Sequence, residues 1–207
     1  TPPQEAAASG VFDVLTYNVH GFPEVIGGIS SSEKKQVSAL IESWNVDIVG
    51  IQENWINHSQ LISKLSHENY AYRSDHFSGG VLSFGDGLLT LSSYAFDSYD
   101  VDRIQFNECK GTIIELFQGK YDSPDCQTEK GFTMSKVSIA RDLSVHVYNL
   151  HHNTGSDAGV NGSNMEQIAE HMNYYSSNNP IIIVGDFNMR FSNEVQKDQY
   201  EDFMEKT

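Results

Sequence analysis

Four apolar stretches of this chain each lead directly into a polar side chain, and this pattern constrains the fold more than any other feature. The four pairs are Val11–Tyr17 before Asn18, Val46–Gln52 before Glu53, Ser144–Leu150 before His151, and Pro180–Gly185 before Asp186. If these runs are strands of like direction, their carboxyl ends gather two carboxylates, an imidazole and two amides at one rim, the second amide being Asn188, two positions after Asp186. Such a rim suits a divalent cation and a phosphate better than a packed core.

Amphipathic helical patterns alternate with the apolar runs, which predicts an α/β fold. Ser30 and Glu33 form a capping-box pattern, and apolar residues follow at helical spacing as far as Trp44. A second helix is predicted over Ser163–Tyr175. The run Ile181–Val184 is of strand length and predicts a strand buried on both faces. The pattern as a whole indicates two sheets with helices packed outside them.

The middle third of the chain predicts shorter strands joined by turns that contain Gly and Asp. These are Leu88–Leu91, Thr112–Phe117, Phe132–Ile139 and Ser144–Leu150. Residues 11–207 contain no internal repeat and no linker, so we expect a single domain there. The polar segment 1–10 is interpreted as a processed, flexible N-terminus.

Cys109 and Cys126 are the only cysteines, and both lie in polar, loop-like surroundings. They predict a disulfide that closes a loop of about 17 residues, worth roughly 3 kcal/mol in the chain-entropy model. The alternative is a pair of unrelated buried thiols. A disulfide would favour a secreted, extracellular protein.

The composition narrows the classes of partner. No apolar run approaches the ~20 residues needed to span a bilayer. The formal net charge of −15 argues against any partner that depends on a broad basic patch. It does not exclude nucleic acid, because a cleft with a bound cation can hold phosphate through that cation.

The types of side chain at the rim favour a hard cation over zinc. Glu53 suits Mg²⁺, which often takes one or two protein carboxylates and completes its shell with water and phosphate. The chain has no HExxH sequence, and the neighbours His151 and His152 would point to opposite faces of an extended segment. Each rim residue also has a structural alternative, because Asn18 suits a turn and Asp186 suits a helix cap.

Four motifs in order, LTYNVHG, IQEN, YNLHHNTG and GDFN, resemble the endonuclease/exonuclease/phosphatase superfamily with the DNase I-like fold. The resemblance runs from about Val11 to Arg190. The segments GDGLLTLSSYAF and DCQTEKGFT are similar to the sphingomyelinase C and secreted phosphodiesterase branch. The fold that this implies is a four-layer α/β/β/α sandwich.

The resemblance implies a role for each rim residue. Glu53 would be the principal ligand of Mg²⁺, or of another hard cation such as Mn²⁺ or Ca²⁺, with Asn18 contacting metal or phosphate. His151 would hydrogen-bond the phosphate and stabilise developing charge. Asp186 and Asn188 would position the attacking water and the phosphate.

Three further residues are assigned to substrate binding. Asp125 and Lys130 match a D-x-x-x-x-K pairing of sphingomyelinases, although a surface salt bridge is the alternative interpretation. Arg190, just beyond GDFN, is assigned with them.

The family's general base is a His in a C-terminal Ser-Asp-His, and Thr207 lies about one helix past GDFN. We therefore expect that base and the closing strands of the sandwich on a missing C-terminal segment, supplied by a second polypeptide or lost by fragmentation or natural truncation. Ser74–His76 reads Ser-Asp-His at the wrong place in the chain and is interpreted as a coincidence.

Three hypotheses follow. The leading one is a secreted, Mg²⁺-dependent phosphodiesterase of sphingomyelinase C type, acting on a phospholipid such as sphingomyelin at a membrane surface. The second is a secreted DNase-type endonuclease. The third is a non-catalytic, toxin-like or scaffold binding module of the same fold.

Overall fold

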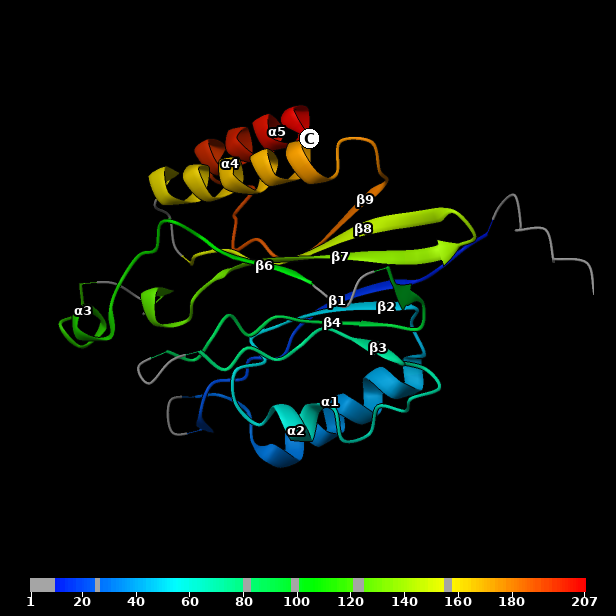
Figure 1. Cartoon of the computed structure of the whole chain (residues 1–207). Coiled ribbons are helices and arrows are strands. Elements are labelled where there is room, and N and C mark those ends of the chain that lie inside the picture. The colour runs from blue at the N-terminus through cyan, green and yellow to red at the C-terminus, as the bar shows by residue number, and fades with distance from the viewer. Residues whose placement is uncertain (1–9, 25–26, 80–82, 98–100, 121–124, 155–157) are drawn as a thin grey trace, which may run out of the picture.

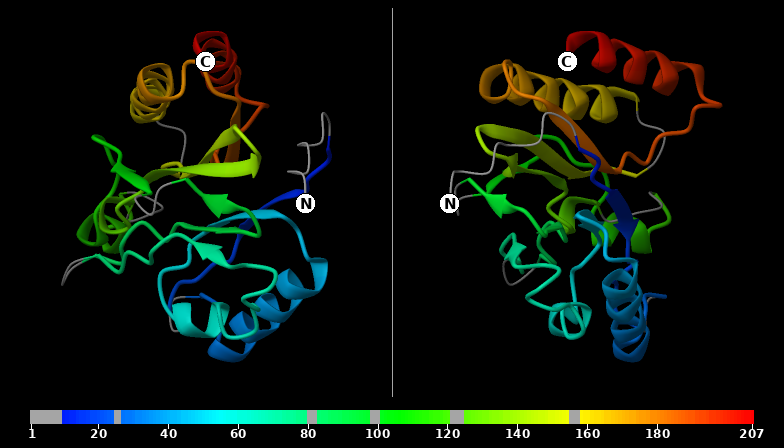
Figure 2. Two further views of the ribbon diagram at one scale, coloured as in Figure 1. Left: turned by 45° about the vertical axis from the view of Figure 1, so that its right-hand side comes forward. Right: turned by 90° about the vertical axis from the view of Figure 1, so that its right-hand side faces the viewer.

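Two β-sheets lie face to face, and helices cover the outer face of each, in a computed structural model that describes residues 10–24, 27–79, 83–97, 101–120, 125–154 and 158–207. Figure 1 shows the four layers, with α1 and α2 below the first sheet and with α4 and α5 above the second. The rotated views in Figure 2 keep the helices outside the strands. The predicted four-layer α/β/β/α sandwich is therefore confirmed.

The first sheet has the strand order β1-β2-β4-β3, and the second has β5-β7-β8-β9 with β6 also paired to β7. The first layers contain β1 (Val14–Asn18), α1 (Ser31–Trp44), β2 (Ile48–Gln52), α2 (His58–Leu61), β3 (Tyr72–Arg73) and β4 (Leu89–Ser92). The others contain β5 (Ala95–Phe96), β6 (Asp102–Gln105), β7 (Gly131–Ala140), β8 (Leu143–His151), α4 (Ala158–Tyr175), β9 (Ile181–Asp186) and α5 (Glu194–Lys206). A short helix, α3 (Ile113–Phe117), lies beside this frame.

Two pairs of parallel strands, one in each sheet, position the residues of the rim. β1 runs parallel to β2, with Asn18 opposite Gln52, and β8 runs parallel to β9, with His151 opposite Asp186. The carboxyl ends of each pair therefore meet at one edge of their sheet. Each pair thus runs in the same direction, as the prediction of the rim required.

The capping box predicted for α1 is present. Ser30 Oγ accepts a hydrogen bond from the Glu33 N–H, and the Glu33 carboxylate accepts one from the Ser30 N–H at 2.7 Å. The helix ends at Trp44, after which Asn45 adopts a left-handed conformation. The cap stabilises α1 by about 1 kcal/mol and fixes the point at which the helix begins.

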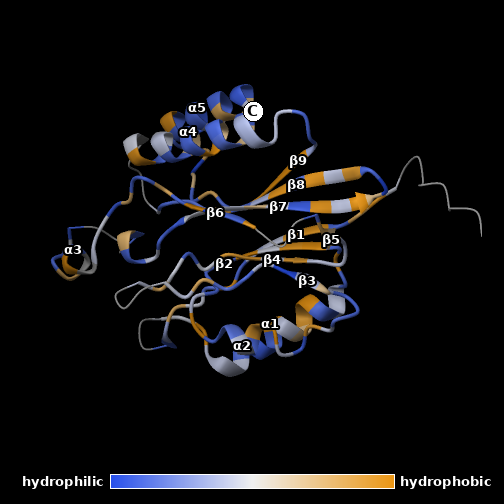
Figure 3. Cartoon of the chain, in the orientation of Figure 1, coloured by the Kyte–Doolittle hydropathy of each residue, from blue (hydrophilic) through white to orange (hydrophobic). Residues whose placement is uncertain are grey.

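Apolar side chains fill each space between layers, and Figure 3 shows the hydrophobic residues along the strands and on the inner faces of the helices. The layer between the two sheets contains Ile48, Val137, Val145, Val147 and Val184. A polar contact crosses it, because Gln52 Nε2 donates to Asn149 Oδ1 at 2.7 Å. Asn149 also donates to the Ile51 and Leu89 carbonyls of the opposite sheet, so this contact favours one alignment of the two sheets.

Three sequence-based predictions of local structure need correction. Thr112–Phe117 is the helix α3 and not a strand, because Thr112 and Glu115 cap each other through their side chains and backbone N–H groups. The strand over Ile181–Val184 is not buried on both faces. β9 is an edge strand of its sheet, and Val184 is its one buried residue. The second helix begins at Ala158, earlier than predicted.

Residues 1–9 lie outside the described part of the chain, so the prediction of a processed N-terminus stays a prediction. Among the described residues, no helix combines the length and the apolar character needed to cross a membrane.

Candidate functional site

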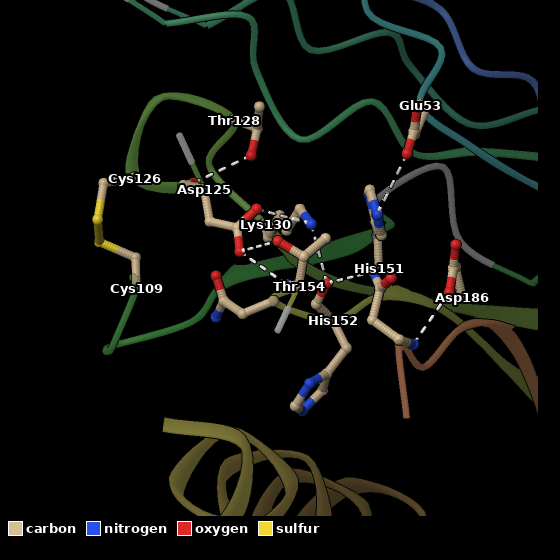
Figure 4. Close-up of polar contacts among 12 residues, drawn as sticks. Glu53, Cys109, Asp125, Cys126, Thr128, Lys130, His151, His152, Thr154 and Asp186 are labelled. Carbon is tan, nitrogen blue, oxygen red and sulfur yellow. Dashed lines mark hydrogen bonds and ion pairs between the residues drawn. A yellow bond between two sulfur atoms is a disulfide. The ribbon is translucent and has the colours of Figure 1, made fainter. Parts of the chain in front are cut away.

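The strand ends of both sheets bring Glu53, His151 and Asp186 together. Glu53 directly follows β2, His151 ends β8 and Asp186 ends β9. One ligand atom from each of the three lies within 4.8 Å of those of the other two. Figure 4 shows the His151 ring directed at Glu53, whereas the ring of His152 points away toward α4. The expectation that one of these histidines faces the rim is met.

Asn18 joins the carboxylates of the two sheets. Its Nδ2 donates to Glu53 Oε1 and to Asp186 Oδ2, both at 2.9 Å, and its Oδ1 accepts from the His20 N–H at 2.9 Å. The amide nitrogen of Asn18, and not its carbonyl oxygen, therefore faces the centre of the cluster. Asn18 thus brings two negatively charged groups close together.

Several atoms of this cluster are buried without a hydrogen-bond partner among the described residues. They are Glu53 Oε2 and both ring nitrogens of His151. His151 Nε2 lies 3.6 Å from Glu53 Oε1, which is too long for a hydrogen bond. Buried polar atoms normally have partners. The lack of hydrogen-bond partners for these atoms indicates that the cluster is suited to bind a further group.

Electrostatics favour a cation at this position. Burial, with a smaller contribution from Lys130 and His152, holds the pKa of His151 well below its ordinary value, so the ring is neutral near pH 7. A neutral imidazole has a free lone pair and two carboxylates offer hard oxygen atoms. The donor set therefore fits a divalent cation.

Asn188 reaches the cluster through the backbone. Its N–H donates to Asp186 Oδ1 at 2.9 Å, and its Nδ2 donates to the His152 carbonyl at the same distance. It has a left-handed φ of 49°. The observed contacts of Asn188 therefore fasten the end of β9 to the end of β8.

Asp125 and Lys130 form a buried ion pair beside the cluster, so the alternative of a surface salt bridge was wrong. Lys130 Nζ lies 2.9 Å from Asp125 Oδ1, and the two side chains are 3% and 1% exposed. Lys130 also donates to the His152 carbonyl at 3.1 Å, and Asp125 accepts from the N–H and hydroxyl of Thr154. The pair anchors the segment that follows His151 (Figure 4).

The predicted disulfide between Cys109 and Cys126 is present, with Cα atoms 5.1 Å apart. It lies directly beside Asp125 in sequence, and Figure 4 shows it next to the buried pair. It therefore ties the loop that carries Asp125 to the chain before α3.

Arg190 is exposed, and no described contact joins its side chain to the cluster. Its N–H donates to Gln196 Oε1 at 2.8 Å. Its assignment to substrate binding stays a prediction. Among the described residues, the Ser74–His76 tripeptide contributes no side chain to the cluster of Glu53, His151 and Asp186, and His76 donates to the Asn54 carbonyl at 3.0 Å.

Two residues near the rim were not predicted. His20 Nδ1 lies 3.5 Å from Glu53 Oε2 with a side chain that is 60% exposed. The Trp55 ring lies 5.8 Å from the His151 ring and 4.2 Å from the Phe22 ring. His20 belongs to the motif that carries Asn18, and Trp55 directly follows the motif that carries Glu53, so their positions were the available signal.

Comparison with known proteins agrees with this geometry. The profile of the Endonuclease/Exonuclease/phosphatase family matches residues 15–195. Sphingomyelinases of Mycobacterium tuberculosis and Mycobacterium bovis are 30% identical over 191 residues, which cover 90% of this chain and 36% of theirs. This chain thus spans about a third of the length of those curated relatives.

Solved structures share the fold. A beta toxin mutant from Staphylococcus aureus with bound magnesium ions matches with a TM-score of 0.72 at 17% identity, over 93% of this chain and 70% of that one. Sphingomyelinase C from Streptomyces griseocarneus matches with a TM-score of 0.71 at 16% identity, over 96% and 70% of the two chains.

Proposed function

Because the chain belongs to the endonuclease/exonuclease/phosphatase family, we propose that it hydrolyses a phosphodiester with a divalent cation held by Glu53 and Asp186 beside His151. One observation carries the proposal. Three ligating side chains from both sheets converge, and atoms of Glu53 and His151 are buried there without partners. A bound Mg²⁺ or Mn²⁺ would polarise the phosphoryl oxygens and offset their negative charge.

The chain's own residues supply the rest of the proposed chemistry. The neutral His151 ring donates to a phosphoryl oxygen and stabilises charge as it develops there. Asn18 Nδ2 holds the carboxylates of Glu53 and Asp186 in place. Asp186 accepts a hydrogen bond from the attacking water and orients it, while Asn188 fixes the turn that carries Asp186.

We propose a phospholipid such as sphingomyelin as the substrate and secretion as the setting. The name of the Mycobacterium relatives supports the substrate. A zwitterionic headgroup carries no net charge, so a protein of net charge −15 is not repelled from such a surface. A DNA backbone would repel it. The disulfide supports secretion.

The test is release of phosphocholine from sphingomyelin vesicles, measured with Mg²⁺ and with EDTA, beside nicking of plasmid DNA. We expect Mg²⁺-dependent phosphocholine release and no nicking from a protein that also carries the family's C-terminal general base, which takes the proton of the attacking water. Glu53→Gln should lower turnover by at least about 10³-fold, while the exposed Glu68→Gln should leave it unchanged.

Other outcomes would replace this proposal. Nicking without lipid hydrolysis would identify a nuclease. Loss of both activities with retained Mg²⁺ affinity would favour the non-catalytic binding module.

A further inference from the structure

We propose that Asn54, held by the buried Lys34, is the residue that positions Glu53 for the cation. This inference rests on the proposed function. Asn54 follows Glu53 in the chain, is fully buried and faces away from solvent. It would act through the turn that carries the ligand and not by contact with substrate.

Glu53 has a backbone conformation that needs support. Its φ is 59°, in the left-handed region that residues other than glycine rarely adopt. Such a conformation is strained and persists only where the surroundings over-determine it. The direction of the Glu53 carboxylate therefore depends on what fixes the residues beside it.

Asn54 uses both its backbone groups and both ends of its side chain to make that connection. Its N–H donates to the Gly87 carbonyl at 2.8 Å, and its own carbonyl accepts from His76 Nε2 at 3.0 Å. Its Oδ1 accepts from Lys34 Nζ at 3.2 Å, and its Nδ2 donates to His58 Nδ1 at 2.7 Å. Four residues of the first half of the chain, Lys34, His58, His76 and Gly87, thus meet at Asn54.

Lys34 gives the clearest sign that this arrangement is specific. The residue lies on α1, it is fully buried, and no carboxylate of the described residues lies within ion-pair distance of it. Its ammonium donates to Asn54 Oδ1 and to the Ile56 carbonyl. Burying an ammonium is costly, yet packing α1 against the sheet does not require a lysine. Both of its described hydrogen bonds go to the turn after Glu53.

Gly21 makes room for the same contact. A Cβ atom there would lie 2.8 Å from Lys34 Nζ and 2.1 Å from the Glu53 carbonyl. The Gly21 N–H donates to that Glu53 carbonyl at 3.0 Å. The segment after Asn18 therefore lies against the turn, and Glu53 is held through its own carbonyl as well as through Asn54.

The experiment measures Mn²⁺ affinity of the whole chain by electron paramagnetic resonance, at a temperature where each variant is folded. Asn54→Leu removes both side-chain hydrogen bonds at similar volume. Lys34→Met removes only the ammonium. Asn164→Leu is the matched control, because Asn164 is an equally buried asparagine on α4. We expect Asn54→Leu and Lys34→Met each to weaken Mn²⁺ binding about tenfold or more, and the control to stay within about twofold.

The double variant separates positioning from general destabilisation. Lys34 and Asn54 share a hydrogen bond and support the same turn, so we expect the double variant to bind Mn²⁺ about as weakly as the single variant with the lower affinity. Additive losses, or affinity within twofold of the parent for both folded single variants, would overturn the inference. Should Asn54→Leu fail to fold, the affinity of Lys34→Met decides alone.

The parent protein and Glu53→Gln separate this inference from the proposed function. If the parent binds no Mn²⁺, the proposed site fails and the inference fails with it. If the parent binds Mn²⁺ through Glu53 while both Asn54→Leu and Lys34→Met bind it equally well, only the role of Asn54 is wrong.

Discussion

Glu53 and Asn188 both occupy the left-handed region, with φ values of 59° and 49°. Each is held by neighbouring backbone contacts, Glu53 through Gly21 and Asn188 through Asp186. Strain of this kind gathers at binding sites because it aims side chains in directions that a regular strand does not allow. At the scale of single residues, the rim is a set of turns whose conformations are fixed by hydrogen bonds.

Asn18 bridges the carboxylates of Glu53 and Asp186, and this gives a prediction. Asn18→Asp replaces the bridging donor with a third negative charge between Glu53 and Asp186. We expect the metal-free variant to lose about 1–3 kcal/mol of unfolding free energy, because like charges repel and the two hydrogen bonds that Asn18 donates are lost.

Thermal melts of the parent and of Asn18→Asp, with EDTA and with Mg²⁺, check this expectation. The increase in Tm that Mg²⁺ produces should be larger for Asn18→Asp than for the parent. An unchanged metal-free Tm would contradict the proposed electrostatics.

His58 provides a prediction about pH. Burial, together with the positive charges of His76, Lys34 and Arg73, lowers the pKa of His58 from 6.5 to about 4. The unfolded chain therefore takes up the proton more readily than the folded protein. The contribution of His58 to stability is complete above pH 6.5 and is lost as the pH falls from 6.5 toward 4.

An NMR titration of the His58 ring tests this directly, and a pKa of 6.5 or higher would be incompatible with the Asn54 contact. His58→Gln should make the fall in unfolding free energy below pH 6.5 less steep. The remaining histidines are unchanged in this variant, so the difference between the two pH profiles reports on His58 alone.

At the scale of elements, a short loop packs against the end of β8 through a buried ion pair. Lys130→Met would leave Asp125 buried without its cation. Breaking such a pair typically costs 3–5 kcal/mol, so we expect a loss of about that size in urea denaturation. Lys197→Met is the control, because Lys197 pairs with Glu201 on the exposed face of α5. It should change stability by less than about 0.5 kcal/mol.

The elements also show what sequence can predict. Local signals were sufficient for α1, whose capping box lies within Ser30–Glu33, and for the runs that became β2 and β8. They failed at α3, where apolar, β-branched residues suggested a strand although Thr112 and Glu115 form their own cap. Propensity is a weak prior when a local hydrogen bond competes with it.

Some contacts of the candidate site could likewise be predicted from the sequence, and others could not. Strand ends predicted that Glu53, His151 and Asp186 would meet, because parallel strands share an edge. The contacts of Lys34 with Asn54, and of Gln52 with Asn149, join residues 20 and 97 positions apart. No periodicity in one sequence encodes such contacts, since they depend on how the layers stack.

At the scale of the whole molecule, the site lies across the seam between the two sheets. Asn18 and Glu53 come from one sheet, and His151 and Asp186 from the other. Any change in the alignment of the sheets would separate these two pairs. The polar contact of Gln52 with Asn149 therefore supports the cluster together with the apolar layer around it.

The disulfide acts on the unfolded chain as a whole. Removing it in a Cys109→Ser, Cys126→Ser variant frees a loop of 17 residues, and we expect a loss of about 3 kcal/mol of unfolding free energy. Guanidinium denaturation of this variant, compared with the oxidised parent, measures the loss. Equal stability of the two proteins would show that the bridge adds nothing to the fold.

The most direct measurement is an anomalous difference map from crystals of the protein soaked in Mn²⁺. The account predicts one strong peak at about 2.0–2.2 Å from a Glu53 carboxylate oxygen, within the cluster that includes His151 and Asp186. That peak should be absent in crystals of Glu53→Gln. A map without a peak at this cluster, or with Mn²⁺ bound only elsewhere on the acidic surface, would contradict the central claim that the strand ends form a cation site.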